Sequence, residues 1–441
     1  MTSIGVSGIM FLFCIALFIV LCFKGHSPMV IGMICIILMS ITTADGFVTG
    51  VFSTATSTIG STLASTILPF STGSILGEFI SCSRVGKVMG DDLVRRFKSK
   101  AAPFIILLFS AILNLLGMAN VSFFIAAFSI PVLAAADLPC YIGLFANTTA
   151  MTIIGFAMPG CVGFPNILAG SLYGIDSLVY APIAGICMTI AGFAVTIFLL
   201  ARFTKKAREN GEGYSEPEKA IFHAIRDEDV DELPSLFIAY APVIIVIAAA
   251  IILNFVVGVD SDVALVCSQI LAALFIIVTC HKYIEGSVFT HFADSFMMAL
   301  GPIMNMAVVS AFAALVTQTS AYNAVVNGLL GLNIHPYFGI ILATSIIAAM
   351  TSDGISTLIT LDATGLAALF NHSGANPEML AQLARTACAG FDTLPYSSNA
   401  IYEMSAFGYT HKGGYKYVFI STVVLPFVML AVGLVVGFIF Y

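Results

Sequence analysis

The chain has 441 residues, of which 59% are hydrophobic and 9% charged, and its mean hydropathy is +1.03. Such a chain has too few charged residues to cover a hydrated surface, so the composition excludes the soluble classes and predicts an all-α polytopic membrane protein. The formal net charge is −7, and no basic stripe suggests nucleic acid as a partner. The expected partner is the lipid bilayer, and the expected location is the cell (inner or plasma) membrane with several spans.

Apolar runs follow one another along the chain. In the first part they cover residues 9–23, 28–42, 47–70, 105–135, 141–157 and 177–201. In the second part they cover residues 236–257, 263–280, 292–306, 337–370, 379–389 and 418–441. Because a simple helical span needs about 20 residues, the longest and shortest runs predict broken helices and re-entrant helical hairpins.

Basic residues concentrate in two segments. Residues 84–100 hold six Lys and Arg residues, and residues 202–232 hold six more together with nine Asp and Glu residues. An excess of Lys and Arg marks cytoplasmic loops. We therefore expect an N-terminal transmembrane repeat over 1–201, a charged cytoplasmic linker over 202–235 and a C-terminal transmembrane repeat over 236–441.

The two halves show opposite charge patterns when one is laid over the other. A shift of roughly 235 positions places residues 84–100 over residues 320–336, which contain no Lys or Arg. The poorly charged turn at Asp176 falls on Lys412 and Lys416. The positive-inside rule then predicts two repeats of inverted topology.

Polar interruptions occur within the long apolar runs of both halves. Residues 117–122 read GMANVS and residues 350–357 read MTSDGIST. Helix breaks at membrane depth are tolerated where the freed backbone lines a cavity or is buried in protein. The alternative interpretation is a Gly/Ser kink that serves helix packing.

Two further segments, 155–174 and 390–408, read like weak copies of each other. Each has short apolar arms around a Pro- and Gly-containing centre, MPGCVGFPN at 158–166 and DTLPYSSN at 392–399. Hairpin tips of this composition expose backbone N–H groups and hydroxyls that can hold a carboxylate. Ordinary turns outside the membrane are the alternative. The predicted substrate-binding residues from breaks and tips are Asn120, Ser122, Gly160, Gly163, Asn166, Ser356, Thr357, Thr393, Tyr396, Ser397, Ser398 and Asn399.

Carboxylates within apolar segments are the candidate coupling-ion sites. Asp353 and Asp392 lie among hydroxyl residues in the second half, and a charge at such depth is costly unless it is functional or paired. Arg385 is the candidate partner for a substrate carboxylate, although it can also reach the surface or pair with Asp362 or Glu403. Glu78 is either a proton site or a partner for Arg84 or Lys87. No cofactor is expected other than H⁺ or Na⁺ as the coupling ion.

Three segments carry a resemblance to a known family. Residues 390–419 (GFDTLPYSSNAIYEMSAFGYTHKGGYKYVF) resemble the late region of gluconate permease family transporters, which reads G-x-D-x-L-P-H-N-G followed by G-x-T-H-x-x-x-Y-K. Residues 159–176 resemble that family's P-P-H-P-G-P segment, and residues 76–93 its early hairpin. The resemblance, to a family within the ion transporter superfamily, implies inverted repeats and uptake of sugar acids or other small hydroxycarboxylates, usually coupled to protons.

The chain differs from that family at the positions where the family has histidines. Tyr396 stands in place of the His after Leu-Pro, and Cys161 with Val162 stands in place of the first His-Pro. The substrate can therefore differ from gluconate, and coupling can rest on carboxylates or on sodium.

Three classes of function are worth weighing: a secondary carboxylate transporter, a membrane enzyme and a channel. We expect a secondary active transporter, a cation-coupled symporter for a small organic anion with H⁺ as the first coupling ion. The alternatives are a Na⁺-coupled transporter of short-chain carboxylates or amino acids, or a channel. No catalytic residues are predicted, because the chain has neither a G-x-S-x-G elbow nor an H-E-x-x-H motif. The ten cysteines show no metal-binding spacing, so no metal site is predicted. The oligomeric state stays open, and a homo-oligomer is compatible with the sequence.

Overall fold

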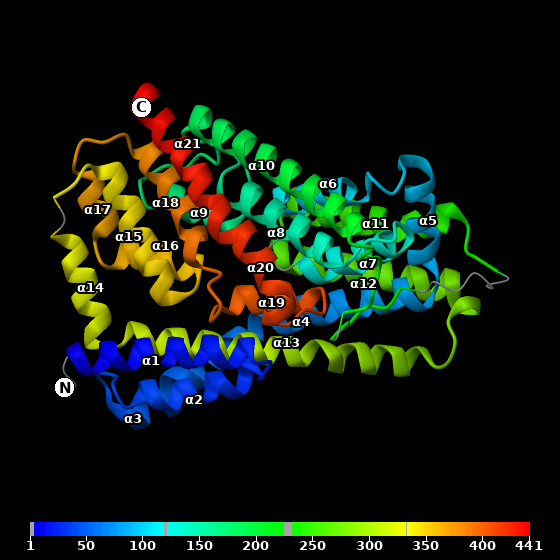
Figure 1. Ribbon diagram of the computed structural model, residues 1–441, viewed down its shortest axis with the longest axis horizontal. Coiled ribbons are helices and arrows are strands. Elements are labelled where there is room, and N and C mark those ends of the chain that lie inside the picture. Colours follow the sequence, from blue (N-terminus) through cyan, green and yellow to red (C-terminus); the bar gives the residue numbers. More distant parts are fainter. Residues whose placement is uncertain (1–3, 119–120, 218, 225–231, 332) are drawn as a thin grey trace.

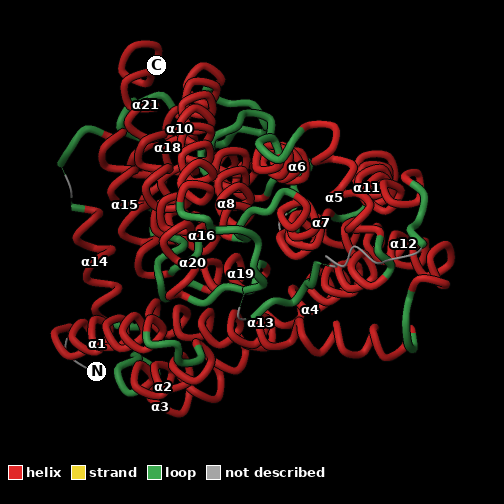
Figure 2. The backbone as a smooth tube through the Cα atoms, turned by 45° about the vertical axis from the view of Figure 1, so that its right-hand side comes forward, coloured by secondary structure: helices red, strands yellow, loops and turns green. Residues whose placement is uncertain are grey.

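The computed structural model describes residues 4–118, 121–217, 219–224, 232–331 and 333–441. Within these ranges the chain is helical, and the only extended pairing is an isolated bridge between Thr43 and Thr319. Seven of the described helices are long and apolar enough to cross a membrane, or eight if the bent pair α5 and α6 forms one span. The predicted class is confirmed: the protein is an all-α, multi-pass membrane protein (Figures 1 and 2).

Long, short and broken helical segments alternate in the part of the chain before the linker. They are α1 (Ile4–Phe23), α2 (Pro28–Ser40), α3 (Gly46–Thr49), η1 (Gly50–Ala55), α4 (Thr56–Cys82), α5 (Val85–Phe97), α6 (Ala102–Leu115), α7 (Ser122–Ala135), α8 (Tyr141–Phe156), α9 (Phe164–Ser171) and α10 (Pro182–Glu209).

The helices after the linker follow a similar order, with α17 in addition and with α12 longer than α2. They are α11 (Leu236–Ile251), η2 (Ile252–Val257), α12 (Ser261–Cys280), η3 (His281–Tyr283), α13 (Val288–Thr317), α14 (Ser320–Leu330), α15 (Pro336–Thr351), α16 (Gly354–Ala363), α17 (Leu366–Asn371), α18 (Pro377–Phe391), α19 (Ser398–Ala406), α20 (His411–Val418), η4 (Phe419–Val424) and α21 (Leu425–Phe440).

Helix packing repeats as well. Helix α1 packs on α2 as α11 packs on α12, and α6 packs on α8 as α15 packs on α18. Helix α2 contacts α13, and the matching α12 contacts α4. Helices α4 and α13 lie side by side along the molecule (Figure 2), and α10 lies along α21. Several helix pairs before the linker thus have a counterpart with an equivalent contact after it.

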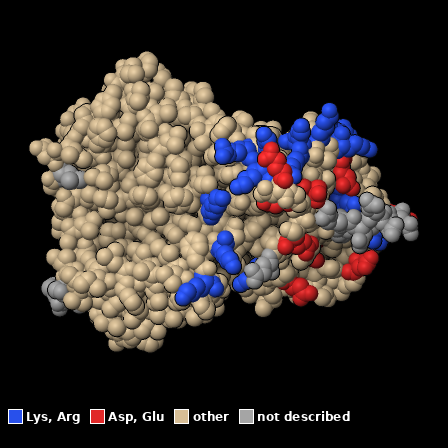
Figure 3. Space-filling model, viewed as in Figure 1, with Lys and Arg blue, Asp and Glu red and all other residues tan. Residues whose placement is uncertain are grey.

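The matching helices α5 and α14 lie at opposite ends of the molecule (Figure 1). Helix α5 turns into α6 with a bend of 115°. The Lys, Arg, Asp and Glu side chains visible in Figure 3 cover the end that carries α5, whereas the visible face of the end that carries α14 lacks them. On this face the charged side chains therefore gather at the end that carries α5, and the inverted topology stays a prediction.

Helices α4 and α13 run well beyond the predicted apolar segments 47–70 and 292–306. The helix that contains α4 covers Gly46–Cys82, and α13 covers Val288–Thr317. The extension of α4 contains small and polar residues that lower the local hydropathy, for example Ser71 and Ser74, whereas the extension of α13 over 307–317 is mostly apolar. Ser74 Oγ donates to the Ser295 carbonyl of α13 at 2.9 Å, so this polar side chain is paired where the two helices pack.

The linker is not uniformly hydrated, contrary to the expectation from its charges. In its described part, Ile221 and Phe222 are buried. Phe222 lies against Gly77 of α4 so closely that a Cβ added there would clash with the Phe222 ring. The linker therefore holds one aromatic side chain against the transmembrane helices.

Candidate functional site

Four helix interruptions define the candidate site. They separate α6 from α7, α8 from α9, α15 from α16, and α18 from α19. Both predicted breaks and both predicted interrupted segments are present, although residues 119–120, which include the candidate Asn120, lie outside the described residues. Helix α9 contacts α16 and α18, and α19 contacts α7 and α8, so the interruptions of one half meet those of the other.

Asp353 forms the start of α16. Ser352 before it has a left-handed φ of 53°, which reverses the chain direction. The Asp353 carboxylate then accepts hydrogen bonds from the backbone N–H of Ser356 at 2.8 Å and from its hydroxyl at 2.5 Å. Thr357 donates to the Asp353 carbonyl at 2.7 Å. This is an N-cap, in which an acidic side chain satisfies the free N–H groups of the first turn.

The loop between α18 and α19 is fixed to that cap. The Ser397 hydroxyl is hydrogen bonded to the carbonyls of Ser352, at 2.9 Å, and Asp392. Tyr396 donates its hydroxyl to the carbonyl of Ala349 at 2.7 Å. The two second-half interruptions therefore form one hydrogen-bonded unit.

The Asp392 carboxylate lies at the start of α16. A Cβ added to Gly354 would meet Asp392 Oδ2 at 3.1 Å. A Cβ at this position would require the carboxylate to shift by a few tenths of an ångström, so glycine favours this close approach, which brings a carboxylate beside the N–H groups of a helix N-terminus.

The first-half loop between α8 and α9 is held by backbone contacts. Asn166 donates its amide to the carbonyls of Cys161 at 2.8 Å and Leu178 at 2.9 Å. The N–H of Gly160, which has a φ of 78°, donates to Leu178 at 3.0 Å, and Gly163 precedes the first turn of α9. Asn166 and Gly160 thus shape this loop.

Arg385 is fully buried and caps the end of α8. Its Nε donates to the carbonyl of Gly155 at 3.0 Å, and its Nη2 donates to those of Ile154 at 3.1 Å and Met158 at 3.0 Å. These are carbonyls left free where α8 stops. The alternatives of a surface position or a pair with Asp362 or Glu403 are wrong, because the guanidinium is buried against backbone of the other half.

A cavity of about 500 Å³ lies where the interruptions meet. Its size falls within the range of small-molecule sites. Of the predicted site residues described by the structure, it is lined by Gly163, Asp353, Asp392 and Asn399. The others support the loops around it: Ser122, Gly160, Asn166, Ser356, Thr357, Thr393, Tyr396, Ser397, Ser398 and Arg385. Ser65 and Thr66 of α4 complete one wall.

Acidic side chains dominate the ionisable groups of the described lining. It contains Asp260, Asp262, Asp353, Asp392 and Glu403, and none of its described residues is Lys, Arg or His. Carboxylates that share a poorly hydrated space repel one another unless protons or metal cations neutralise them.

Glu403 is a buried acidic lining residue that the sequence analysis did not select as a site. Its two carboxylate oxygens accept from the Ser122 hydroxyl at 2.8 and 3.0 Å and from the Asn147 amide at 2.8 Å. Ser122 stands at the start of α7, and its N–H donates to the hydroxyl of Tyr402 at 3.1 Å. Glu403 therefore joins α19 to α7 and α8 of the other half.

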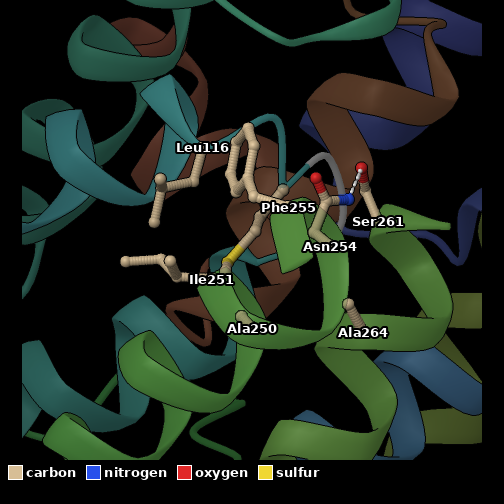
Figure 4. Close-up of a pocket in the computed structure, with 8 residues that line it drawn as sticks. Leu116, Ala250, Ile251, Asn254, Phe255, Ser261 and Ala264 are labelled. Atoms are coloured by element: carbon tan, nitrogen blue, oxygen red, sulfur yellow. Dashed lines mark hydrogen bonds between the residues drawn. The ribbon is translucent and has the colours of Figure 1, made fainter. Parts of the chain in front are cut away.

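A smaller pocket adjoins this cavity beside the turn between α11 and α12. Figure 4 shows Leu116 from the first break facing Ile251 and Phe255 across it. Asn254 donates to the Ser261 hydroxyl at 2.9 Å, which holds the turn next to the acidic pair Asp260 and Asp262.

Comparisons with known proteins place the chain beside transporters. No family model matches it. It is similar to the uncharacterized transporter YxjC of Bacillus subtilis (strain 168), with 22% identity over 468 residues that cover 96% of this chain and 97% of the relative.

Two solved transporter structures were also found. The YdaH transporter of Alcanivorax borkumensis matches with a TM-score of 0.38 and 12% identity, covering 94% of this chain and 98% of that one. MtrF of Neisseria gonorrhoeae, from a class of antimetabolite efflux pumps, matches with a TM-score of 0.37 and 15% identity, covering 94% and 95%. None of the three is named a gluconate permease.

Proposed function

We propose that the protein is a cation-coupled secondary active transporter of a small organic anion. The observation that carries the proposal is the group of three carboxylates, Asp353, Asp392 and Glu403, around one cavity between interrupted helices. Interrupted helices that meet at such a cavity are the usual architecture of substrate and coupling-ion sites in secondary transporters. The similarity of nearly the whole chain to a protein named a transporter supports the same class.

Coupling to a cation follows from the charge of the cavity. An organic anion that enters beside ionised carboxylates meets strong repulsion, since a charge in a low-dielectric site is poorly screened. Protonation of one or more carboxylates, or a bound Na⁺, removes that repulsion and lets the anion bind. Substrate and cation then bind cooperatively, which is the thermodynamic requirement for symport.

The anion itself is the second part of the proposal. The N-terminus of α9 lines the cavity, and a helix N-terminus favours a carboxylate. The resemblance to gluconate permeases suggests sugar acids or other small hydroxycarboxylates. Hydroxyl groups on such substrates suit Asn399 and Ser65, which also line the cavity.

The direct test is uptake into proteoliposomes that contain the purified protein. Gluconate, hydroxybutyrate, lactate and amino acids are each offered under separate proton and sodium gradients. We expect accumulation of a hydroxycarboxylate driven by a proton gradient. Accumulation driven by a sodium gradient alone would identify Na⁺, not H⁺, as the coupling ion. Flux without accumulation under either gradient would contradict symport.

Asp392→Asn tests the role of the carboxylates. We expect this variant to lose accumulation against a gradient while it still exchanges internal for external substrate, because exchange needs binding but no net cation movement. The matched control is Asp362→Asn, since Asp362 is exposed on α16, away from the cavity lining. Accumulation by Asp392→Asn at the level of the unmodified protein would remove Asp392 from the coupling site.

A further inference from the structure

Helices α4 and α13 bring together three metal-ligating side chains far from the cavity. Glu78 and Cys82 are four residues apart on α4 and share one face, and His291 lies opposite them on the first turn of α13. One ligand atom from each, a carboxylate oxygen, the thiol sulfur and an imidazole nitrogen, all lie within 4.8 Å of one another.

The hydrogen bonds of His291 determine which ring nitrogen faces the cluster. Its Nε2 lies 2.7 Å from the carbonyl oxygen of Glu285. A carbonyl only accepts, so Nε2 carries the hydrogen and donates it. In the neutral ring, Nδ1 is then the nitrogen with a free lone pair. A histidine that ligates a metal usually has its other nitrogen fixed in this way.

Nδ1 of His291 faces Glu78 Oε1 at 2.8 Å. Two acceptor atoms at this distance repel each other unless a cation lies between or beside them. The cation is either a second ring proton, which makes an imidazolium–carboxylate pair, or a metal ion. The expected partners Arg84 and Lys87 do not fill this role, since Arg84 pairs with Glu285 and Lys87 with Asp91.

Cys82 distinguishes between these two cations. A proton shared by His291 and Glu78 does not interact with a sulfur atom nearby, whereas a thiolate is a strong ligand for Zn²⁺ and other thiophilic metals. The side chains of His291 and Glu78 are 24% and 17% exposed, so the cluster is reachable from water. Three protein ligands with one position left for water is a common zinc arrangement.

We infer that Glu78, Cys82 and His291 form a binding site for a thiophilic divalent metal ion such as Zn²⁺. The bound ion would join α4, before the linker, to α13, after it, near the charged end of the molecule (Figures 1 and 3). This site is independent of the proposed transport function, because none of its ligands lines the cavity.

The test uses the full chain purified in detergent and stripped of metal with a chelator. Co²⁺, a spectroscopic substitute for Zn²⁺, is added, and the absorption is recorded. We expect a thiolate-to-cobalt charge-transfer band that Zn²⁺ removes by displacement. If the unmodified chain gives a Co²⁺ spectrum without that band, the assignment is overturned, and no variant is needed to reach that conclusion.

Variants then identify the ligands. Competition against a chromophoric chelator is expected to show Zn²⁺ binding that Cys82→Ser and His291→Gln each weaken by roughly tenfold or more. Cys267→Ser removes an exposed cysteine elsewhere on α12 and should leave binding unchanged. Equal Zn²⁺ affinity in Cys82→Ser and the unmodified chain would leave only an imidazolium–carboxylate pair and contradict the metal site.

Discussion

At the scale of single residues, the position of Arg385 indicates that its guanidinium stabilises the end of α8. Its three hydrogen bonds go to carbonyls at the end of α8. Arg385→Gln shortens the side chain and leaves buried carbonyls unpaired, which costs about 1–3 kcal/mol for each group. We expect a clear fall in the midpoint of thermal unfolding in detergent. Arg202→Gln, at an exposed position, is the control. An unchanged midpoint together with lost substrate binding would instead assign Arg385 to the substrate.

Glu403 gives a second residue-scale prediction. Its carboxylate is satisfied by neutral donors, Ser122 and Asn147, so a glutamine amide can occupy the same place with one oxygen still accepting. If Glu403 carries the coupling proton, Glu403→Gln should insert and fold normally but lose the pH dependence of substrate exchange. The measurement is exchange in proteoliposomes across pH. A variant with the pH profile of the unmodified protein would give Glu403 a structural role only.

At the scale of elements, the break before α16 combines a cap and a charge in Asp353. Asp353→Ala removes the acceptor for the Ser356 N–H, and loss of an N-cap costs about 1 kcal/mol. Asp353→Asn keeps a capping oxygen but removes the charge. We therefore expect only the alanine variant to be less stable to heat, whereas both lose accumulation of substrate. Normal accumulation by the asparagine variant would show that Asp353 serves the helix alone.

The linker is the second element with a testable attachment. Phe222 packs against Gly77 and lies edge-to-face with Phe123, with ring centroids 6.3 Å apart. Phe222→Ala removes most of this contact, and loss of a buried Phe side chain costs about 3–5 kcal/mol. We expect limited trypsin digestion to cut the segment 202–235 faster than in the unmodified protein. Glu209→Ala, at an exposed position, should be cut at the original rate. Equal rates for Phe222→Ala would mean that the linker is held elsewhere.

At the scale of the whole molecule, the two halves should have opposite orientations in the membrane. The turn between α5 and α6 and the turn between α14 and α15 lie at opposite ends of the structure (Figure 1). Lys100→Cys and Asn333→Cys, each introduced with Cys267→Ser, place a reactive thiol at one of these exposed turns. In intact cells, an impermeant maleimide should label only the cysteine at 333. Labelling of both from the same side would contradict the inverted topology.

Much of the fold follows from the sequence because the bilayer imposes simple rules. Backbone groups in lipid must be paired within the segment, so apolar runs become helices, and polar interruptions such as MTSDGIST become breaks. The run 47–70 ends before α4 does, because the last turns of α4 carry buried polar residues such as Ser71 and Ser74 that lower the hydropathy. The run 292–306 ends before α13 does, although residues 307–317 are mostly apolar. Phe222 is buried in a segment whose charges indicate exposure, because hydropathy does not register packing between distant parts of the chain.

The sequence by itself determined the class, the helix breaks and the acidic residues Asp353 and Asp392, since these depend on local composition and on the cost of a charge in an apolar run. Only the tertiary structure decided which polar groups meet. In the structure, Arg385 donates to carbonyls at the end of α8, and Glu403 accepts from Ser122 and Asn147. His291 lies beside Glu78 and Cys82. These partners are far apart along the chain, and no local pattern specifies a contact that forms only when two helices pack.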